Sequence, residues 1–418
     1  MNNLKIFTIL SLTVCAAKDT VTQPLPKPSS RSQVLHDQFV RLHDAAEQGN
    51  TVFGYWCGPT EGGNCGSTDF SDINVAAVTH APFAFAFISD QGVVSLEYDA
   101  PIDTKQLLDQ GVIPGISLGG AAANPNNCLD HIDTCVTSLG DVLTTYEKKN
   151  SPFFFVDSDF ESPEDSAQMD RLIQFWLAFR QQYPEYLITM APECAYLWCG
   201  DASWPYNAYV SVINQLGPAG ADIIYRINVQ AFNNWCSLTA SAGEQQFNED
   251  VASTFINPCP QTGYLGLKNN TKLFGLGVLG ANEDGEGYTR PEVLKKSLAA
   301  INSTYGTCNA MFWNTLTDTN NPDGRWAISS TMGDGQTQPP TLSPIAAQDS
   351  DDYEANDWLY GGLVFGSVVM SAVCAIFCCA KRSPDEKYGD AYLPLSHGRL
   401  YDERFLQPYS KAVTFNGS

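Results

Sequence analysis

The sequence is short of basic side chains. It has 23 Lys and Arg against 46 Asp and Glu, so its formal net charge is −23. A protein that binds nucleic acid neutralises the phosphate backbone with clustered Lys and Arg. The charge balance therefore argues against a nucleic-acid partner, and it is compatible with a neutral substrate.

Histidine is also scarce, with five in 418 residues. Neither His80 nor His131 lies in an H-E-x-x-H motif, and no spacing of Cys and His is typical of a zinc site. The chain has no G-K-[ST] loop, and no Gly-rich phosphate turn follows the first apolar run after residue 50. We therefore expect no metal and no cofactor, and we interpret both histidines as structural or surface residues.

Two long apolar segments stand near the ends of the chain. Residues 1–17 carry one Lys, an apolar run and small residues, which predict a secretory signal peptide; a short membrane anchor is the alternative, but its apolar core is too short. Residues 358–380 form an uncharged run long enough for a transmembrane helix. Lys381 and Arg382 follow it directly, which places the C-terminal side in the cytoplasm.

These segments predict a type I single-pass membrane protein of the plasma membrane or an endomembrane, with its main domain outside the cell or in the lumen. A GPI signal is the alternative for 358–380, but such a signal ends with its apolar run, whereas a polar tail, 381–418, follows here. In that tail Tyr392 begins a Y-x-x-Φ pattern of the endocytic type, which also occurs by chance.

Composition divides the rest of the chain into three parts. Residues 18–50 form an N-terminal extension with a weak helical pattern over 33–48, either a pro-segment or a permanent part of the protein. Residues 51–328 have the pattern of a globular domain. Residues 329–357 are rich in Ser, Thr, Pro, Gln and Asp, which predicts a flexible stalk.

Cysteine usage agrees with export. Cysteines between the two apolar segments suggest loop disulfides by their short spacings, although connectivity cannot be read from sequence. The expected pairs are 57/65, 128/135, 194/199 and 236/259, and Cys308 is left over. Asn269 and Asn302 lie in N-x-[ST] motifs and are acceptors for N-glycans in a lumenal chain.

Strand-like and helical patterns alternate through the central domain. Strands that alternate with helices imply parallel pairing, and eight such units predict a TIM (β/α)8 barrel; a doubly wound α/β sheet is the alternative. The eight apolar runs are 51–56, 75–88, 112–119, 152–161, 187–192, 223–232, 273–279 and 310–314.

The fourth run turns acidic at its end. Asp157, Asp159 and Glu161 alternate with other residues, so they share one face of the predicted strand. A solvated edge strand and a calcium loop are the alternatives. The apolar run 153–156 argues against an edge, and the glycine and ligand spacing of an EF-hand are missing. Since barrel active sites lie at the C-terminal ends of strands, we predict catalytic carboxylates at the barrel mouth.

Several motifs fall at successive strand ends in a fixed order. They are Gly54-Tyr-Trp56, Ser117-Leu-Gly-Gly120, Asp157-Ser-Asp-Phe-Glu161, Met190-Ala-Pro-Glu-Cys194, Val229-Gln-Ala-Phe-Asn-Asn234 and Met311-Phe-Trp-Asn314. Through them, residues 52–313 resemble the family 18 glycoside hydrolases, the chitinases, and especially the compact plant and fungal class III type. Each motif alone is weak, and their common order carries the resemblance.

The resemblance implies a mechanism in which one acid works with the acetamide group of the substrate. Glu161 is the implied general acid. Asp159 raises the pKa of that acid and then orients the acetamide, and Asp157 supports Asp159. Trp313 is the implied apolar floor under the sugar. The other implied substrate-binding residues are Tyr55, Ser117, Met190, Glu193, Gln230, Phe232 and Asn233, with Trp56 and Trp198 as further aromatic candidates.

Two positions depart from the family pattern. Phe154 stands where the acidic signature begins with Asp, and Phe232 stands where the sixth strand has Tyr. Losing one preorganised donor typically costs roughly a hundredfold to a thousandfold in rate. The implied function is retaining hydrolysis of β-1,4-linked N-acetylglucosamine polymers, chitin or chitooligosaccharides. The alternatives are a weak or inactive chitin-oligosaccharide lectin or receptor, and an endo-β-N-acetylglucosaminidase that acts on N-glycans.

Overall fold

A computed structural model describes residues 30–57, 70–96, 102–121, 123–161, 166–199, 207–218, 220–233, 236 and 245–334, all within one compact unit, Met1–Ser343. The expected signal peptide, transmembrane segment and cytoplasmic tail lie outside these residues, as does most of the expected stalk. In the part of the chain that the model describes, no helix is both long and apolar enough to cross a membrane.

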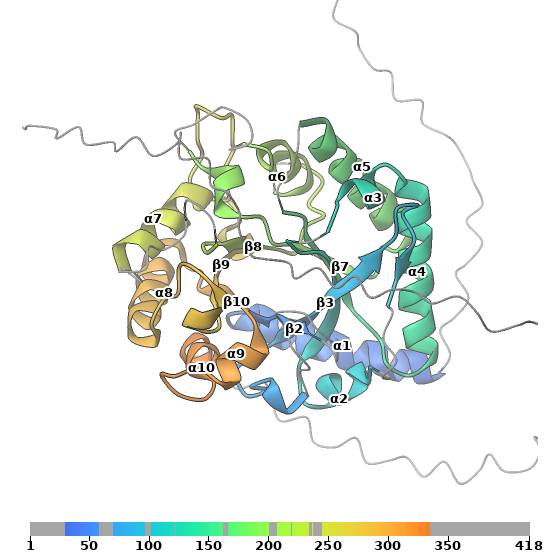
Figure 1. The fold of residues 1–418 in the computed structure, drawn as a ribbon, viewed down its shortest axis with the longest axis horizontal. Helices are drawn as coiled ribbons and strands as arrows, with labels where there is room; N and C mark the ends of the chain where they lie inside the picture. Colours follow the sequence, from blue (N-terminus) through green and yellow to red (C-terminus); the bar gives the residue numbers. More distant parts are fainter. Residues whose placement is uncertain are drawn as a thin grey trace, which may run out of the picture. The chain divides into compact units, whose positions relative to one another are not determined.

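Eight parallel strands form a closed ring (Figure 1). Each strand pairs with the next along the chain, and β1 pairs with both β10 and β3, which closes the barrel. This confirms the predicted TIM barrel. The strands are β1 (Val52–Gly54), β3 (His80–Ile88), β5 (Ile113–Gly119), β6 (Phe155–Asp159), β7 (Leu187–Met190), β8 (Arg226–Gln230), β9 (Phe274–Leu279) and β10 (Asn309–Trp313).

Seven of the eight predicted runs contain one of these strands whole, and β10 begins one residue before its run, 310–314. Two short strands add to the ring: β2 (Trp56–Cys57) continues the pairing with β3, and β4 (Val94–Ser95) forms an antiparallel hairpin with it. Ring strands are buried on both faces because helices cover the outside and side chains fill the inside, which explains their near-continuous apolar sequences.

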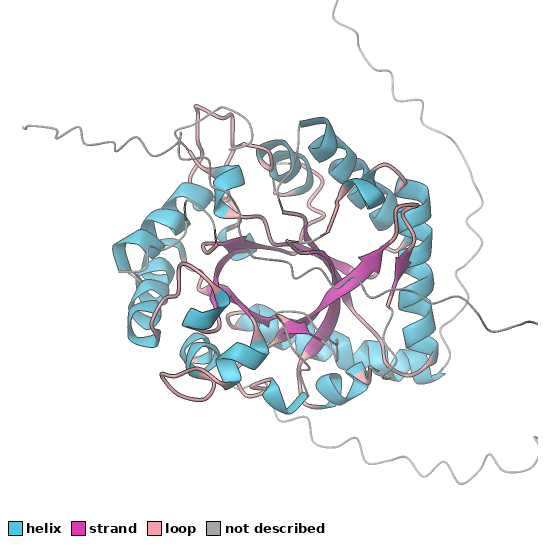
Figure 2. Ribbon diagram, viewed as in Figure 1, coloured by secondary structure: helices cyan, strands magenta, loops and turns pink. Residues whose placement is uncertain are grey.

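Helices surround the ring (Figure 2). One core cluster lies between the sheet and these helices, and a second lies inside the barrel. The helices are α1 (Ser30–Gln48), α2 (Thr104–Asp109), α3 (Asn126–Leu129), α4 (Ile132–Lys148), α5 (Ser166–Gln182), α6 (Val210–Leu216), α7 (Gln245–Ile256), α8 (Pro291–Tyr305), α9 (Thr315–Thr319) and α10 (Ala327–Gly333).

Helix α1 confirms the helical pattern of the N-terminal extension and shows that this segment is part of the folded unit. Its residues Leu35, Phe39 and Leu42 are buried in the cluster inside the barrel. The ring of Phe39 stacks on Phe154, just before β6, with centroids 4.6 Å apart. The helix therefore covers the N-terminal end of the barrel, opposite the strand ends that carry the acids.

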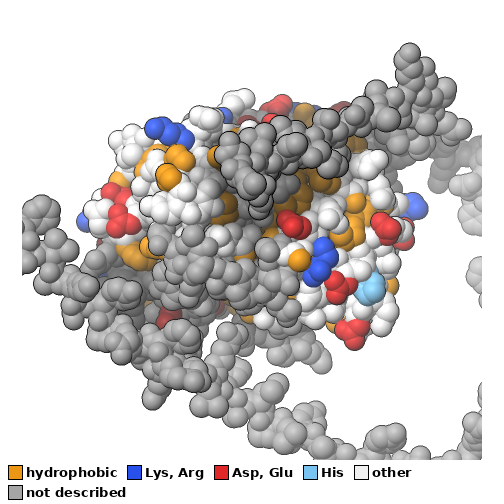
Figure 3. Space-filling view, turned by 90° about the horizontal axis from the view of Figure 1, so that it is seen from above, with side chains coloured by type: hydrophobic (Ala, Val, Ile, Leu, Met, Phe, Trp, Pro, Cys, Tyr) orange, Lys and Arg blue, Asp and Glu red, His pale blue; other side chains and the backbone are white. Residues whose placement is uncertain are grey.

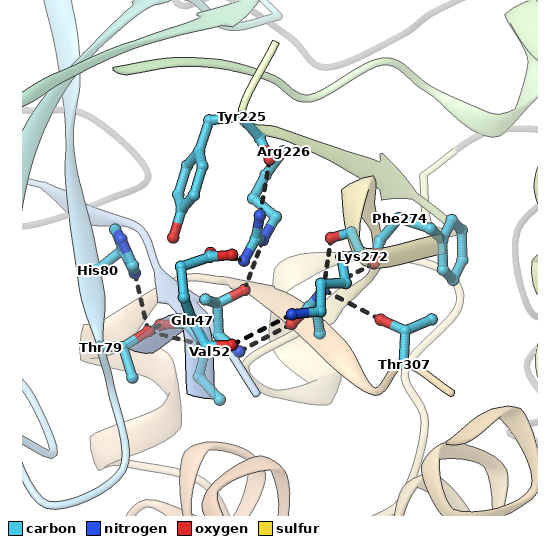
Figure 4. A network of polar contacts seen from close by, with 11 residues as sticks. Glu47, Val52, Thr79, His80, Tyr225, Arg226, Lys272, Phe274 and Thr307 are labelled. Carbon is cyan, nitrogen blue, oxygen red and sulfur yellow. Dashed lines mark hydrogen bonds and ion pairs between the residues drawn. The ribbon is translucent and has the colours of Figure 1, made fainter. Parts of the chain in front are cut away.

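A polar network fixes α1 to this end of the barrel (Figure 4). Arg226, at the start of β8, is buried, and it forms an ion pair and hydrogen bond with Glu47 of α1. It also donates to the Thr51 hydroxyl at 3.1 Å, and it lies 4.1 Å from the centroid of the Tyr225 ring. His80 is buried beside them; burial lowers its pKa well below the ordinary value, as suits a structural histidine.

The boundary predicted at residue 328 is wrong. Helix α10 continues to Gly333, and its residues Ile328, Ser329 and Met332 are buried. Two backbone amides at its start donate to the Asp318 carboxylate, at 2.8 and 3.2 Å. The Ser and Thr residues of this short helix resemble the polar stretch that follows, although three of its seven residues are buried.

The disulfides correct two predicted pairs. Cys128–Cys135 and the unpaired Cys308 are confirmed. Cys194 pairs with Cys236, and Cys199 pairs with Cys259, in place of 194/199 and 236/259. Cys194 follows β7 and Cys236 follows β8, so the first bridge joins neighbouring loops, which sequence spacing cannot show. Cys57 is also disulfide-bonded, and Cys65, its expected partner, lies outside the described residues.

Candidate active site

Asp157 is the buried centre of the site. Its Oδ2 accepts hydrogen bonds from the hydroxyls of Tyr55 at 2.6 Å and Ser117 at 2.7 Å, and its Oδ1 accepts from the Thr189 hydroxyl at 2.6 Å. Ser117 and Thr189 pair in register with Asp157 on the two neighbouring strands, β5 and β7. Burial raises the pKa of Asp157, and the three donors lower it.

Asp159 ends β6 one layer above Asp157. Gln230, the last residue of β8, donates to Asp159 Oδ1 at 2.5 Å and to the Ala191 carbonyl at 2.7 Å. Burial raises the pKa of Asp159 well above its ordinary value, and the charges of Glu161, Asp157 and Glu193 raise it further. The row therefore retains a proton at pH values where an isolated aspartate is ionised.

Two more carboxylates lie near Asp159. Glu161 is two residues further along the chain and half-buried, and Glu193 follows β7, where its backbone bridges to Gln230. Both charges act on the pKa of Asp159. The site thus joins the three acids of the predicted row to a fourth, which sequence analysis had assigned to substrate binding.

Aromatic rings form one wall of the site. The Trp313 ring, at the end of β10, stacks on Phe85 with centroids 5.6 Å apart, and it also lies 5.6 Å from Tyr55. A Cβ on Gly120 would lie 2.5 Å from the Phe85 ring, so only glycine leaves room for that ring. Trp313 and Phe85 remain half-buried and so retain surface that a sugar ring can cover.

The two departures from the family pattern occupy different ends of the barrel. Phe232 is buried in the interior cluster just after β8, while Phe154 faces α1 at the N-terminal end. Asn233 was expected to contact the substrate. Instead, its side-chain oxygen and nitrogen both form hydrogen bonds with the β9–α8 loop. Its Oδ1 accepts from the Glu286 amide at 2.9 Å, and its Nδ2 donates to the Asp284 carbonyl at 3.3 Å.

Other predicted residues take different roles from those expected. Met190 is buried in the cluster between the sheet and the helices, because the neighbouring Thr189 faces into the barrel and side chains alternate along a strand. It is therefore core and not a substrate contact. Trp56 likewise packs outside the barrel, with its ring 4.7 Å from Phe70. Trp198 is partly buried against the same outer cluster.

Sequence analysis missed Thr189 and Phe85. Thr189 stands one residue before the Met190 motif. Side chains alternate along a strand, so pairing Asp157 with its neighbour on β7 would have indicated that Thr189 faces the same side. Phe85 lies in a run of alternating Ala and Phe that gave no sign of which ring faces the site. In the part of the chain that the model describes, no group of three or more His, Cys, Asp or Glu side chains could hold a metal ion.

Charged side chains are mixed on the face seen in Figure 3. Acidic and basic side chains lie side by side there, among apolar ones, where the surface is not covered by grey atoms. His131, at the start of α4, is exposed, as predicted for a surface histidine. Asn269 and Asn302 are also exposed, and glycosylation at these positions stays a prediction.

A closed parallel barrel with an acidic row at its C-terminal end defines the class of fold. No protein-family model and no curated protein matches the chain. Among solved structures, a family GH18 chitinase from Chromobacterium violaceum matches with a TM-score of 0.56 and 21% identity, over 68% of this chain and 83% of that chain.

Two further structures have the same fold. The C-terminal domain of ChiA from Legionella pneumophila gives a TM-score of 0.52 at 16% identity, over 66% of this chain and 96% of its own. A fungal endo-β-N-acetylglucosaminidase of glycosyl hydrolase family 18 gives 0.50 at 17% identity, over 68% and 96%. At these identities the likeness shows a shared fold, the (β/α)8 barrel of these enzymes.

Proposed function

We propose that the protein hydrolyses β-1,4-linked N-acetylglucosamine polymers, chitin or chitooligosaccharides, with retention of configuration. The observation that carries the proposal is the row Asp157, Asp159 and Glu161 at the mouth of the barrel, beside the half-buried ring of Trp313. A row of acids whose charges raise the pKa of one member, next to an apolar surface for a sugar, suits acid catalysis on a glycosidic bond.

In this proposal Glu161 protonates the glycosidic oxygen. The acetamide oxygen of the substrate attacks the anomeric carbon, the bond to the leaving sugar breaks, and an oxazolinium intermediate forms. Water then adds to the anomeric carbon, returns a proton to Glu161 and releases the sugar with retention. Asp159 orients the acetamide, and Asp157 holds Asp159 from below. The hydroxyls of Tyr55, Ser117 and Thr189 keep the buried Asp157 satisfied.

One observation favours a second candidate function, a chitin-oligosaccharide lectin or receptor. Phe232 is buried where the related enzymes place a tyrosine, and a phenyl ring offers no donor to the acetamide. The intact pair of Asp159 and Glu161 favours the enzyme, since a binding protein does not need a proton on that pair. Hydrolysis of the N-glycan core uses the same acids and differs in the shape of the cleft.

The direct test is turnover by the full-length protein. Chitotetraose and chitopentaose are incubated with wild type and with Glu161→Gln from about pH 4 to pH 8, and products are separated by chromatography. We expect turnover in wild type and none in the variant. Tight binding in both proteins without turnover in either would contradict the enzyme and favour the lectin as the function.

We also propose that the barrel faces the lumen or the cell exterior as part of a type I membrane protein. The exposed acceptors Asn269 and Asn302 give the readout. Enzymatic removal of N-glycans should lower the apparent mass of the wild type and leave the doubly substituted Asn→Gln variant unchanged. A wild-type protein whose mass does not respond would contradict this placement.

A further inference from the structure

The loops that follow β8, β9 and β10 meet at one residue, Asp284. Asp284 ends the short 3-10 helix Asn282–Asp284 in the loop after β9. Its Oδ2 accepts hydrogen bonds from the Thr317 hydroxyl at 2.5 Å and from the Ala281 amide at 3.1 Å, and its Oδ1 accepts from Asn314 Nδ2 at 3.4 Å. One side chain thus joins its own loop to the loop after β10.

The link to β10 fixes the residue next to Trp313. Asn314 follows Trp313 directly and caps α9, where its Oδ1 accepts from the Thr317 amide at 3.2 Å. The Thr317 hydroxyl, which donates to Asp284, also accepts from the Asn314 backbone amide at 3.3 Å. The Gly280 amide donates to the Trp313 carbonyl, and a Cβ on Gly280 would lie 2.5 Å from the Asn314 carbonyl oxygen. The two loops are therefore in close backbone contact.

The link to β8 uses the other end of the same loop. Asn233 donates to the Asp284 carbonyl at 3.3 Å and exchanges two hydrogen bonds with the backbone of Glu286, each 2.9 Å. Between them Gly285 has a φ of +141°, and a Cβ there would lie 1.9 Å from Asn233 Oδ1. Only glycine fits this position, so the backbone next to Asp284 packs directly against Asn233 at the end of β8.

We infer that Asp284 is a positioning residue for sugar binding: its ionised carboxylate holds the loop after β9 against the end of β10 and so fixes the Trp313 floor. The inference rests on the proposed function. It assigns to the site a residue that does not itself face the sugar and that lies outside the motifs at the strand ends.

The charge on Asp284 makes this role dependent on pH. Burial, with a smaller contribution from the charge of Glu283 on the same loop, raises the pKa of Asp284 to about 6, although its hydrogen bonds lower it. The groups that contact it from the other two loops, Asn233, Asn314 and Thr317, are uncharged. A proton on Oδ1 would meet the amide donor of Asn314 and break that bond, so oligosaccharide binding should weaken as the pH falls below about 6.

The test measures binding of chitotetraose by calorimetry, in full-length protein that carries Glu161→Gln to prevent turnover. For this parent we expect the Kd to rise about tenfold from neutral pH to about pH 4.5, with a midpoint near 6. Asp284→Asn keeps the shape of the side chain and removes the charge. It should bind about tenfold more weakly at neutral pH and lose this pH-dependent step, and Asp284→Ala should do the same.

Glu283→Gln is the matched control, because Glu283 is exposed on the same loop. It should keep the affinity of the parent at neutral pH and move the midpoint to lower pH. If folded Asp284 variants bind like the parent at every pH, the role of Asp284 is wrong, while the proposed function still stands. A parent that neither binds chitotetraose, nor turns it over when Glu161 is restored, would overturn the proposed function together with this inference.

Discussion

Asp157 shows how a charged row can exist inside a barrel. A buried carboxylate without partners is costly, whereas one that accepts several hydrogen bonds is tolerated. Ser117 of β5, Thr189 of β7 and Tyr55, between β1 and β2, supply three donors, all at 2.7 Å or less. The acid is therefore fixed in position, and its charge acts on the pKa of Asp159 toward the open end of the barrel.

Thr189→Val tests this arrangement, because valine keeps the shape of threonine and removes one donor to Asp157. We expect a loss of about 1–3 kcal/mol in the free energy of unfolding, since the variant leaves a buried acid with one partner fewer. The acid limb of the pH–rate profile should also move to higher pH. Urea unfolding and initial rates measure the two effects.

Thr289→Val is the control for the same change. Thr289 is buried, and its hydroxyl has no hydrogen-bond partner among the described residues. The variant should be at least as stable as wild type, because valine removes a buried hydroxyl that has no partner there. A loss at Thr289 as large as that at Thr189 would show that the cost lies in threonine packing, not in the bond to Asp157.

Phe232→Tyr tests whether the missing hydroxyl limits the rate. If the proposed function is correct, a donor beside the acetamide should raise kcat roughly a hundredfold, since one preorganised donor is worth that much. Phe232→Leu, which keeps an apolar side chain and adds no donor, serves as the comparison. Equal rates in the tyrosine variant and wild type would mean that another group already supplies the donor.

At the scale of elements, the sequence predicted all eight strands of the ring and the acids of β6. These predictions were correct because a strand or helix is indicated by the spacing of apolar residues within a short segment of sequence. Met190 was misassigned because a motif does not say which face of its strand each residue takes. The two wrong cysteine pairs and the role of Asp284 depend on which loops meet, and contacts between loops leave no local pattern in the sequence.

Helix α1 is the element whose importance the sequence hides most. Glu47→Gln should cost about 3–5 kcal/mol in the free energy of unfolding, because it leaves the guanidinium of Arg226 buried without its acid. Glu292→Gln is the control: its pair with Arg290 lies on the surface, and the loss should be about 1 kcal/mol or less. Denaturant unfolding compares them, and similar losses would show that α1 does not depend on the buried pair.

At the scale of the whole chain, buried titratable groups act in opposite directions. Burial raises the pKa of Asp159, Asp284 and Asp318, and it lowers the pKa of His43 and His80. The raised acids stabilise the fold in acid, and the buried neutral histidines stabilise it at higher pH. Stability measured on wild type alone therefore mixes two trends, and single variants are needed to separate them.

Asp318→Asn separates one of these trends. The folded-state pKa of Asp318 is raised from 3.8 to about 6, so its contribution to stability is complete below about pH 3.8 and is lost as the pH rises through 6. The difference in unfolding free energy between wild type and variant should change by about 2.4 kcal/mol between pH 4 and pH 7, in favour of wild type at low pH.

Thermal and urea unfolding at several pH values measure this difference. Asp222→Asn is the control, because Asp222 is exposed and its φ of 51° suits asparagine equally well. Its difference from wild type should stay constant with pH. A constant difference for Asp318→Asn as well would show that the buried carboxylate does not carry the expected proton linkage.

The cover that α1 forms over the barrel also sets an order of events during synthesis. Glu47 leaves the ribosome 179 residues before Arg226, its partner at the start of β8. Until β8 has been made and placed, the helix has neither its counter-charge nor the complete ring beneath its apolar face. The first described element of the chain is thus among the last to reach its final place, and a nascent chain halted before residue 226 would keep that face available to chaperones.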